Sequence, residues 1–119
     1  LADVQAAFPD SRRTALRFRD GACCGCNLFA FLTPAGLRAP AFWRRMEQQR
    51  KKPHCLAAAL GVGTLVAYLC GRLTLAAALC RLSDRVGTRI AAVLLDDPHA
   101  AVDVDSVADY ELVRRLTER

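Results

Sequence analysis

The sequence predicts an α/β fold in which helices cover a mixed β-sheet. Three observations support it. Hydrophobic residues make up 53% of the 119 residues and aromatic residues 7%, which describes an Ala, Leu and Val core typical of helices on a sheet. Strand-like runs occur near both ends of the chain, at 14–19, 27–32, 89–95 and around Asp103 and Asp105. The stretch between them has the apolar spacing and the caps of helices, which gives the order ββαααββα.

The N-terminal run alternates as a half-buried strand does. In residues 14–19, Leu16 and Phe18 lie on one face, and Arg17 and Arg19 lie on the other. A glycine-bounded loop follows at 20–25. Residues 27–32 are mostly apolar, which fits a strand buried on both faces.

The middle of the chain predicts helices. Thr33 and Pro34 start the first, whose regular part we expect at about 40–50. Residues 55–71 are uncharged for 17 residues, which is the lower limit for a membrane span, but Gly61 and Gly63 interrupt them.

We therefore expect two or three core helices over 55–86, capped at Thr64 and Thr74 and closed by Gly87. The alternative is a peripheral membrane contact through 55–80, next to the basic run at 50–52.

The C-terminal end combines a strand with a capped helix. Ser106 is a good N-cap, and Asp109 three residues later completes a capping box. We expect the final helix at about 107–117. Its inward side chains are expected to be Tyr110, Val113 and Leu116, and its i, i+4 ion pair to be Glu111–Arg115.

Two carboxylates precede this helix at i and i+2, so on a strand they share one face. Asp103 and Asp105 would repel each other there unless a cation lies between them. A magnesium ion held by one or two carboxylates plus substrate phosphates is one explanation. A solvated strand end leading into a capped helix is the other.

The residues Asp103-Val104-Asp105-Ser106-Val107-Ala108-Asp109-Tyr110 resemble the "DVDTPEDL" segment near the end of the MobA-like nucleotidyltransferases. Val107 replaces the family's Pro, and Ala108 replaces its Glu. A second match, Thr14–Gly21 followed by Gly25-Cys26-Asn27-Leu28-Phe29, is similar to the central strand, glycine loop and substrate-facing Asn of that superfamily.

This resemblance implies a Rossmann-like enzyme that transfers a nucleotidyl group from a nucleoside triphosphate to a phosphorylated acceptor and releases pyrophosphate. It implies that Asp105 is a Mg²⁺ ligand and that Asp103 is a second or water-mediated one. Asn27 would bind the acceptor, with Gly21 and Gly25 allowing close backbone approach.

Arg17 and Lys52 are candidate phosphate contacts. The alternative for Arg17 is a solvent-facing strand residue, and for Lys52 a member of a solvated basic run.

The Gly-x-Gly-x-Arg phosphate loop with which these enzymes begin does not occur in residues 1–119. We therefore expect residues 1–119 to be one domain that forms the C-terminal portion of a longer nucleotidyltransferase. The alternative is a non-catalytic binding or membrane-docking domain derived from the same fold. The nucleotide, the acceptor and the oligomeric state do not follow from the sequence.

Charge and cysteine content narrow the function classes. The net charge of +5 is uneven, with half of the acids at 96–111, and a nucleic-acid binder would more often show one continuous basic face. The six cysteines lack the paired spacing of zinc sites, and no histidine stands at a diagnostic spacing for cysteine catalysis. No signal peptide is present, so we expect free thiols and a cytoplasmic location.

Overall fold

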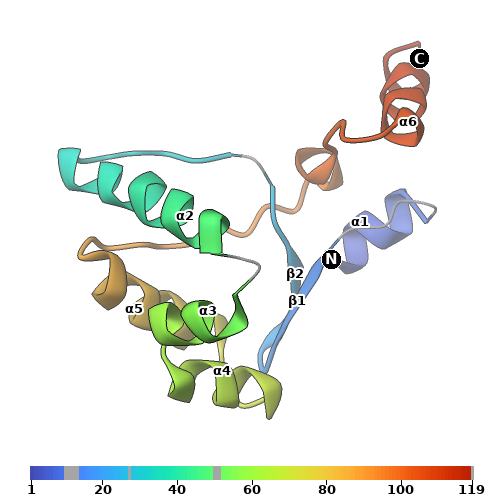
Figure 1. The fold of residues 1–119 in the computed structure, drawn as a ribbon. Helices are drawn as coiled ribbons and strands as arrows, with labels where there is room; N and C mark the ends of the chain where they lie inside the picture. The colour runs from blue at the N-terminus through green and yellow to red at the C-terminus, as the bar shows by residue number, and fades with distance from the viewer. Residues whose placement is uncertain (10–13, 27, 50–51, 119) are drawn as a thin grey trace. The chain divides into compact units, whose positions relative to one another are not determined.

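The computed structural model describes residues 1–9, 14–26, 28–49 and 52–118. In this part of the chain, six α-helices, two 3₁₀ helices and a two-stranded sheet formed by β1 and β2 are present (Figure 1). In chain order the elements are α1 (Ala2–Ala7), β1 (Ala15–Phe18), β2 (Gly21–Cys24), η1 (Pro34–Leu37), α2 (Arg38–Gln49), α3 (Pro53–Leu60), α4 (Val62–Leu69), α5 (Leu75–Val86), η2 (Pro98–Ala101) and α6 (Val107–Thr117). The fold is helix-rich with a small sheet.

The chain divides into two compact units. The first unit comprises Leu1–Leu16, Ala22–Phe29 and Leu94–Arg119, and the second comprises Arg17–Gly21 and Ala30–Val93. The first unit therefore holds α1, η2 and α6, and the second holds η1 and the helices α2 to α5.

The core of the first unit is small. Val4, Phe8 and Ala101 are its buried residues. Cys24, Val102, Leu112 and Leu116 pack against them. The ring of Phe8 also meets the ring of His99 edge-on, with 5.5 Å between centroids. This cluster joins α1 to η2 and α6.

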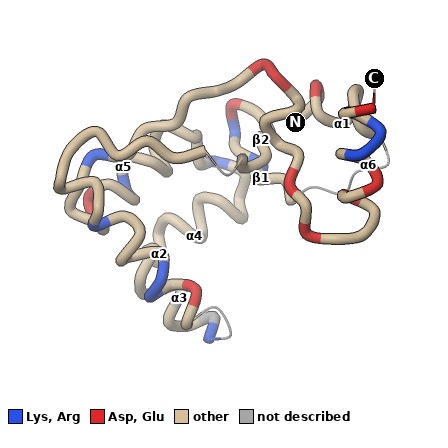
Figure 2. The backbone as a smooth tube through the Cα atoms, turned by 90° about the horizontal axis from the view of Figure 1, so that it is seen from above, with Lys and Arg blue, Asp and Glu red and all other residues tan. Residues whose placement is uncertain are grey.

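In the second unit, arginine side chains join the helices. Arg81 Nη1 donates to Thr64 Oγ1 (3.2 Å), and Arg85 Nη1 donates to the carbonyl of Ala58 (3.2 Å). Arg38 Nη1 donates to the carbonyl of Gly87 (2.8 Å). Blue segments on α2 and α5 in Figure 2 mark where basic residues lie on these helices. Part of the positive charge therefore serves helix packing.

The predicted helices are confirmed where their signals are local. α5 begins at Thr74, whose Oγ1 accepts from the Ala77 N–H (3.2 Å), and ends at Gly87 with φ +76°. α6 spans 107–117 as expected, with Ser106 as its N-cap. The cap at Thr64 was wrong, because α4 begins after Gly61 and Thr64 lies inside that helix.

The strand predictions fared differently. The strand at 14–19 is confirmed by β1, at Ala15–Phe18. The other three are wrong within the described residues: 28–32, 89–95 and the run around Asp103 and Asp105 have no strand structure. The physical reason is that a strand needs a neighbouring strand to pair with, and among the described residues only β1 and β2 pair with each other.

The inward face of α6 also differs from the prediction. Tyr110 is 60% exposed, whereas Leu112 and Leu116 contact the core of the first unit. Among the described residues, an i, i+4 ion pair joins Arg114 Nε to Glu118 Oε1 (2.8 Å), and none joins Glu111 to Arg115. The prediction is thus wrong for Tyr110, whereas Val113 and Leu116 are half-buried as expected.

Within the described residues, no helix has both the length and the apolar character needed to cross a membrane.

Candidate functional site

The turn before α6 carries the two predicted metal ligands. We call residues 103–106 the aspartate turn. At its end, Ser106 has an extended backbone (φ −140°, ψ 166°) and its Oγ accepts from the Asp109 N–H (3.3 Å). The same Oγ donates to Asp109 Oδ2 (2.6 Å). These two bonds fix the start of the helix and therefore the direction in which the aspartate turn enters it.

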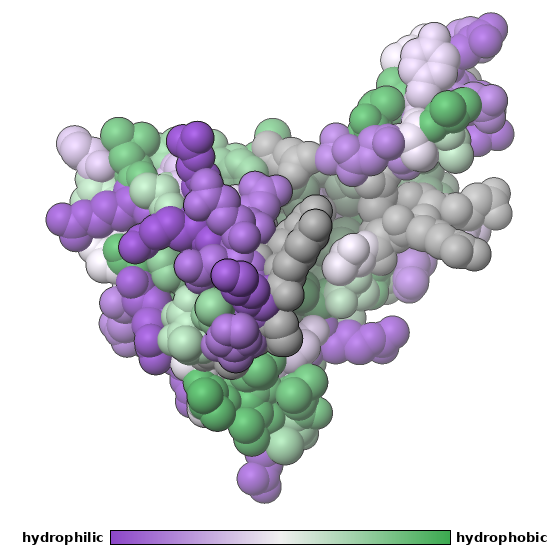
Figure 3. Space-filling model, in the orientation of Figure 1, coloured by the Kyte–Doolittle hydropathy of each residue, from purple (hydrophilic) through white to green (hydrophobic). Residues whose placement is uncertain are grey.

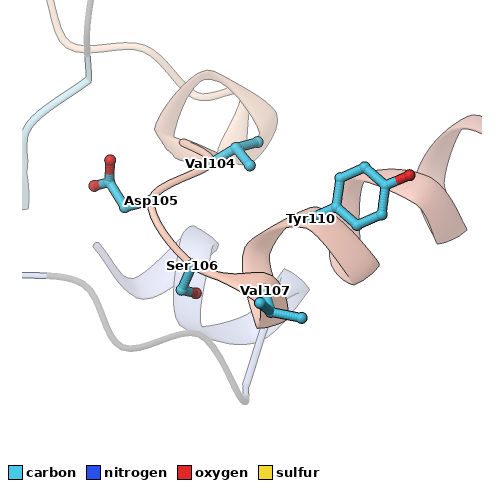
Figure 4. A pocket seen from close by; sticks show the side chains of 5 residues that line it. All are labelled: Val104, Asp105, Ser106, Val107 and Tyr110. Carbon is cyan, nitrogen blue, oxygen red and sulfur yellow. The ribbon is translucent and has the colours of Figure 1, made fainter.

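The two carboxylates of the turn have different surroundings. Asp103 is half-buried, and its Oδ1 accepts from the Val104 N–H (3.0 Å). Asp105 is exposed and lines an open hollow of about 430 Å³ together with Val104, Ser106, Val107 and Tyr110. Figure 4 shows the Asp105 carboxylate and the Tyr110 ring pointing away from each other. Asp103 is not one of the residues that line this hollow.

This arrangement can contribute part of a cation site. Within the described residues, no group of three or more His, Cys, Asp or Glu side chains is placed to hold a metal ion. Mg²⁺ commonly takes one or two carboxylates and completes its octahedron with water and substrate phosphates. The exposed carboxylate of Asp105 suits the first of these roles.

The glycine loop gives one clear structural constraint. Gly21 has φ +146° at the turn between β1 and β2, a conformation that L side chains rarely adopt. Gly25 has no positive φ, and a Cβ built on it would meet nothing within 4 Å. The contacts of the described residues therefore do not explain a glycine at 25. Asn27 lies outside the described residues.

Arg17 and Lys52 belong to the second unit, and both are exposed. The Arg17 backbone N–H donates to the Tyr68 hydroxyl (3.3 Å). Lys52 sits in the link between α2 and α3, where its N–H donates to the Gln49 carbonyl (2.8 Å). These bonds position the two backbones.

The sequence patterns did not predict one polar pair, which Asp97 and His99 form. Asp97 Oδ1 accepts from the His99 N–H (2.9 Å) and lies 2.8 Å from His99 Nδ1. The bond from the His99 backbone N–H, followed by the one with the ring, holds the pKa of Asp97 below its usual value of 3.8. The Asp-Pro-His order was the available signal, since an Asp before Pro caps a helical turn at i+2.

The cysteines stay free. Cys23, Cys24, Cys26 and Cys55 are half-buried, and Cys70 and Cys80 are exposed. The sequence expectation of free thiols agrees with this.

No family model and no curated protein matches the chain. A solved structure of a hypothetical transferase from Thermus thermophilus does match, with 34% sequence identity and a TM-score of 0.78. The match covers 91% of this chain and 47% of that chain. The chain is similar in fold to part of a transferase. It spans about half the length of the protein that it matches.

Proposed function

We propose that this chain is the C-terminal portion of a MobA-like nucleotidyltransferase with a Rossmann-like architecture. The observation that carries the proposal is the 34% identity to a hypothetical transferase over 91% of this chain. The aspartate turn supports it, because Asp105 directly precedes a helix capped by Ser106, within the segment that resembles the MobA-like enzymes.

The proposed reaction moves a nucleoside monophosphate from a nucleoside triphosphate to a phosphorylated acceptor. A phosphate oxygen of the acceptor attacks the α-phosphorus in line and forms the new phosphorus–oxygen bond. The bond between the α-phosphorus and the oxygen that bridges to the β-phosphorus breaks, and pyrophosphate leaves with that electron pair. Because the protein forms no covalent bond to the substrate in this reaction, catalysis depends on positioning the reactants and neutralising their charge.

The aspartate turn would supply the protein's share of charge neutralisation. Asp105 would ligate Mg²⁺, and Asp103 would act as a second or water-mediated ligand; the ion neutralises phosphate charge when bound. Two carboxylates plus phosphate oxygens make a donor set of hard oxygens, which fits Mg²⁺. The free thiols are compatible with the reducing cytoplasm in which we place the enzyme.

The acceptor would lie against the glycine loop. Asn27 would hydrogen-bond the acceptor. The open space at Gly25 would let the acceptor approach the backbone of that residue closely. Gly21 would keep the turn of the hairpin. Arg17 and Lys52 would contact phosphates through their exposed side chains.

Nucleotide binding to the complete native polypeptide that contains this chain tests the proposal without knowledge of the acceptor. Calorimetric titration with each of the four nucleoside triphosphates, with and without Mg²⁺, should show Mg²⁺-dependent binding of at least one. Asp105→Asn should weaken that binding by about tenfold or more. Glu111→Gln, which removes the same charge from an exposed position on α6, is the matched control.

Absence of binding for all four nucleotides would overturn the transferase proposal. Binding that Asp105→Asn leaves unchanged would remove Asp105 from the mechanism.

A second candidate function rests on α4. Val62, Leu65, Val66 and Leu69 follow the i, i+3, i+4, i+7 spacing of one helix face, and all four are exposed. Figure 3 shows hydrophobic side chains gathered over this part of the second unit. An exposed apolar stripe of this kind suits a non-catalytic domain that docks on a membrane surface.

Sedimentation with anionic lipid vesicles separates the two functions. Membrane docking predicts that the 119-residue chain co-sediments and that Val66→Glu releases it. A chain that stays in the supernatant at low salt would rule this candidate out.

A further inference from the structure

Three cysteines lie within four residues at the end of β2. Cys23 and Cys24 are the last two residues of the strand, and Cys26 follows after a single glycine. All three side chains are half-buried and carry free thiols. We call them the cysteine cluster. The proposed transfer reaction uses none of these thiols, so their chemistry is unassigned.

Cys23 is an unfavourable disulfide partner for either of the others. The Cα atoms of neighbouring residues such as Cys23 and Cys24 lie about 3.8 Å apart across a trans peptide. A disulfide joins Cα atoms about 4.4–6.8 Å apart, so this pair is too close. Side chains alternate along a strand, so Cys23 also starts on the face opposite to Cys24 and Cys26.

Cys24 and Cys26 need only a small bend to meet. Residues two apart share one face of an extended chain, and their Cα atoms then lie about 6.6 Å apart. This separation is at the upper end of the range for a disulfide, so a bend at residue 25 brings the two thiols within bonding reach. The bend is available because β2 ends at Cys24 and the strand ladder does not extend to residues 25 and 26.

Gly25 permits that bend. A Cβ built on this glycine would meet nothing within 4 Å, and its φ is not in the left-handed region. Neither the packing nor the backbone conformation of the described residues therefore requires a glycine here. A residue without a Cβ does let the chain turn tightly between two cysteines. A bond between Cys24 and Cys26 thus gives a reason for the glycine that the other contacts do not give.

We propose that Cys24 and Cys26 are a redox-active thiol pair that closes to a disulfide across Gly25 on reaction with a small-molecule disulfide such as glutathione disulfide. One cysteine thiolate attacks a sulfur of glutathione disulfide, whose S–S bond breaks, and a glutathione thiolate leaves with the electron pair. The second cysteine attacks the resulting mixed disulfide and releases the second glutathione. The two cysteines lose two electrons and two protons in total, and glutathione disulfide gains both to become two glutathione molecules.

The pair is a reversible switch rather than a permanent crosslink. A disulfide between residues two apart closes a small ring, and strained disulfides are the ones that are most readily reduced. Excess glutathione in a reducing compartment therefore keeps Cys24 and Cys26 as free thiols, and a rise in oxidised glutathione closes the bridge.

The bridge acts on two parts of the first unit. Cys24 packs against the buried cluster of Val4, Phe8 and Ala101, so drawing its sulfur toward Cys26 changes a core contact. The bridge also spans Gly25, against which the acceptor lies in the proposed function, and it therefore hinders acceptor binding. Only this second consequence rests on the proposed function.

Mass spectrometry of the 119-residue chain tests the proposal without nucleotide or acceptor, so its outcome does not depend on the transfer reaction. The reduced chain is equilibrated with glutathione disulfide, alkylated at its remaining thiols and digested with trypsin, which releases residues 20–38 as one peptide containing the cysteine cluster. The expected product is this peptide with an internal disulfide, lighter by two hydrogen atoms, and with Cys23 alkylated. Excess reduced glutathione should restore three alkylated cysteines.

Serine variants identify the pair. Cys26→Ser and Cys24→Ser should each abolish the internal disulfide and leave only glutathione adducts on the remaining thiols. Cys23→Ser is the matched control and should leave the disulfide intact. Cys24 contacts the core of the first unit, whereas Cys26 is not among the described residues that pack against it. Cys26→Ser therefore decides the question if Cys24→Ser fails to fold.

Three results would overturn the proposal. The first is a wild-type chain that carries glutathione adducts but no internal disulfide. The second is an internal disulfide that persists in Cys26→Ser, and the third is one that Cys23→Ser removes.

Discussion

Helix α5 and residues 91–96 lie close together in the sequence, yet only the first forms regular structure. Residues 75–86 form a helix with a Thr74 cap and a Gly87 terminus. Residues 91–96 form no regular structure, although their composition favours a strand. The difference lies in where the hydrogen bonds come from.

A helix satisfies its interior backbone groups within itself, and its caps satisfy part of the ends. A strand cannot do so, because each of its backbone groups must find a partner on another strand. Local sequence signals are therefore sufficient for α5 and insufficient for residues 91–96. Ser83 lies at the border between the two, since its Oγ donates to the Leu79 carbonyl inside the helix and accepts from the Ile90 N–H beyond it.

The largest expected effect on stability comes from comparing a buried leucine next to α5 with an exposed leucine in residues 91–96. Leu73 is 5% exposed, and Leu73→Ala should lower the free energy of unfolding by about 2–5 kcal/mol. Leu94 is 71% exposed, and Leu94→Ala should change it by about 0.5 kcal/mol or less. Urea unfolding of the 119-residue chain measures both. A large cost at Leu94 would show that residues 91–96 already pack in the isolated chain.

A smaller effect tests whether local backbone signals determine the helices. Gly87 has φ +76° and an added Cβ would lie 3.3 Å from Arg38 Nη1. Gly87→Ala should therefore lower the free energy of unfolding by about 1–2 kcal/mol. Gly63 lies inside α4 with nothing within 4 Å of an added Cβ, so Gly63→Ala should stabilise by about 0.5–1 kcal/mol. Thermal unfolding should show a lower midpoint for Gly87→Ala and a higher one for Gly63→Ala. Shifts of the same sign would contradict the idea that local backbone signals determine the helices.

The smallest effect concerns the turn at Asp97, directly after residues 91–96. The pKa of Asp97 is lower in the folded chain than its usual value of 3.8, so its hydrogen bonds stabilise the fold above that pH. This contribution is lost as the pH falls through the lowered pKa. Asp97→Asn should therefore differ from the wild type in unfolding midpoint near neutral pH, and the difference should shrink below pH 3.8.

Asp96→Asn controls for the loss of one negative charge next to this turn. A pH-independent difference between wild type and Asp97→Asn would argue against the role of the carboxylate.

The candidate site shows the same division between local and distant information. The Ser106–Asp109 cap and the helix after it could be read directly from the sequence, because both depend on residues three or four apart. The different surroundings of Asp103 and Asp105 could not. They follow from a turn where the sequence predicts a strand, and a strand depends on partners that lie outside the local sequence.

The sequence by itself determined the position and ends of α2, α5 and α6 and the first strand of the hairpin, because capping, helical spacing and alternation act over a few residues. Tertiary structure alone decided that Leu112 packs against the core of the first unit and that Tyr110 stays exposed, whereas the sequence already predicted Leu116 as inward. It also decided that 28–32 and 91–96 are not strands in the described part of the chain. The physical reason is that burial and strand pairing depend on surfaces contributed by distant segments, which no local pattern encodes.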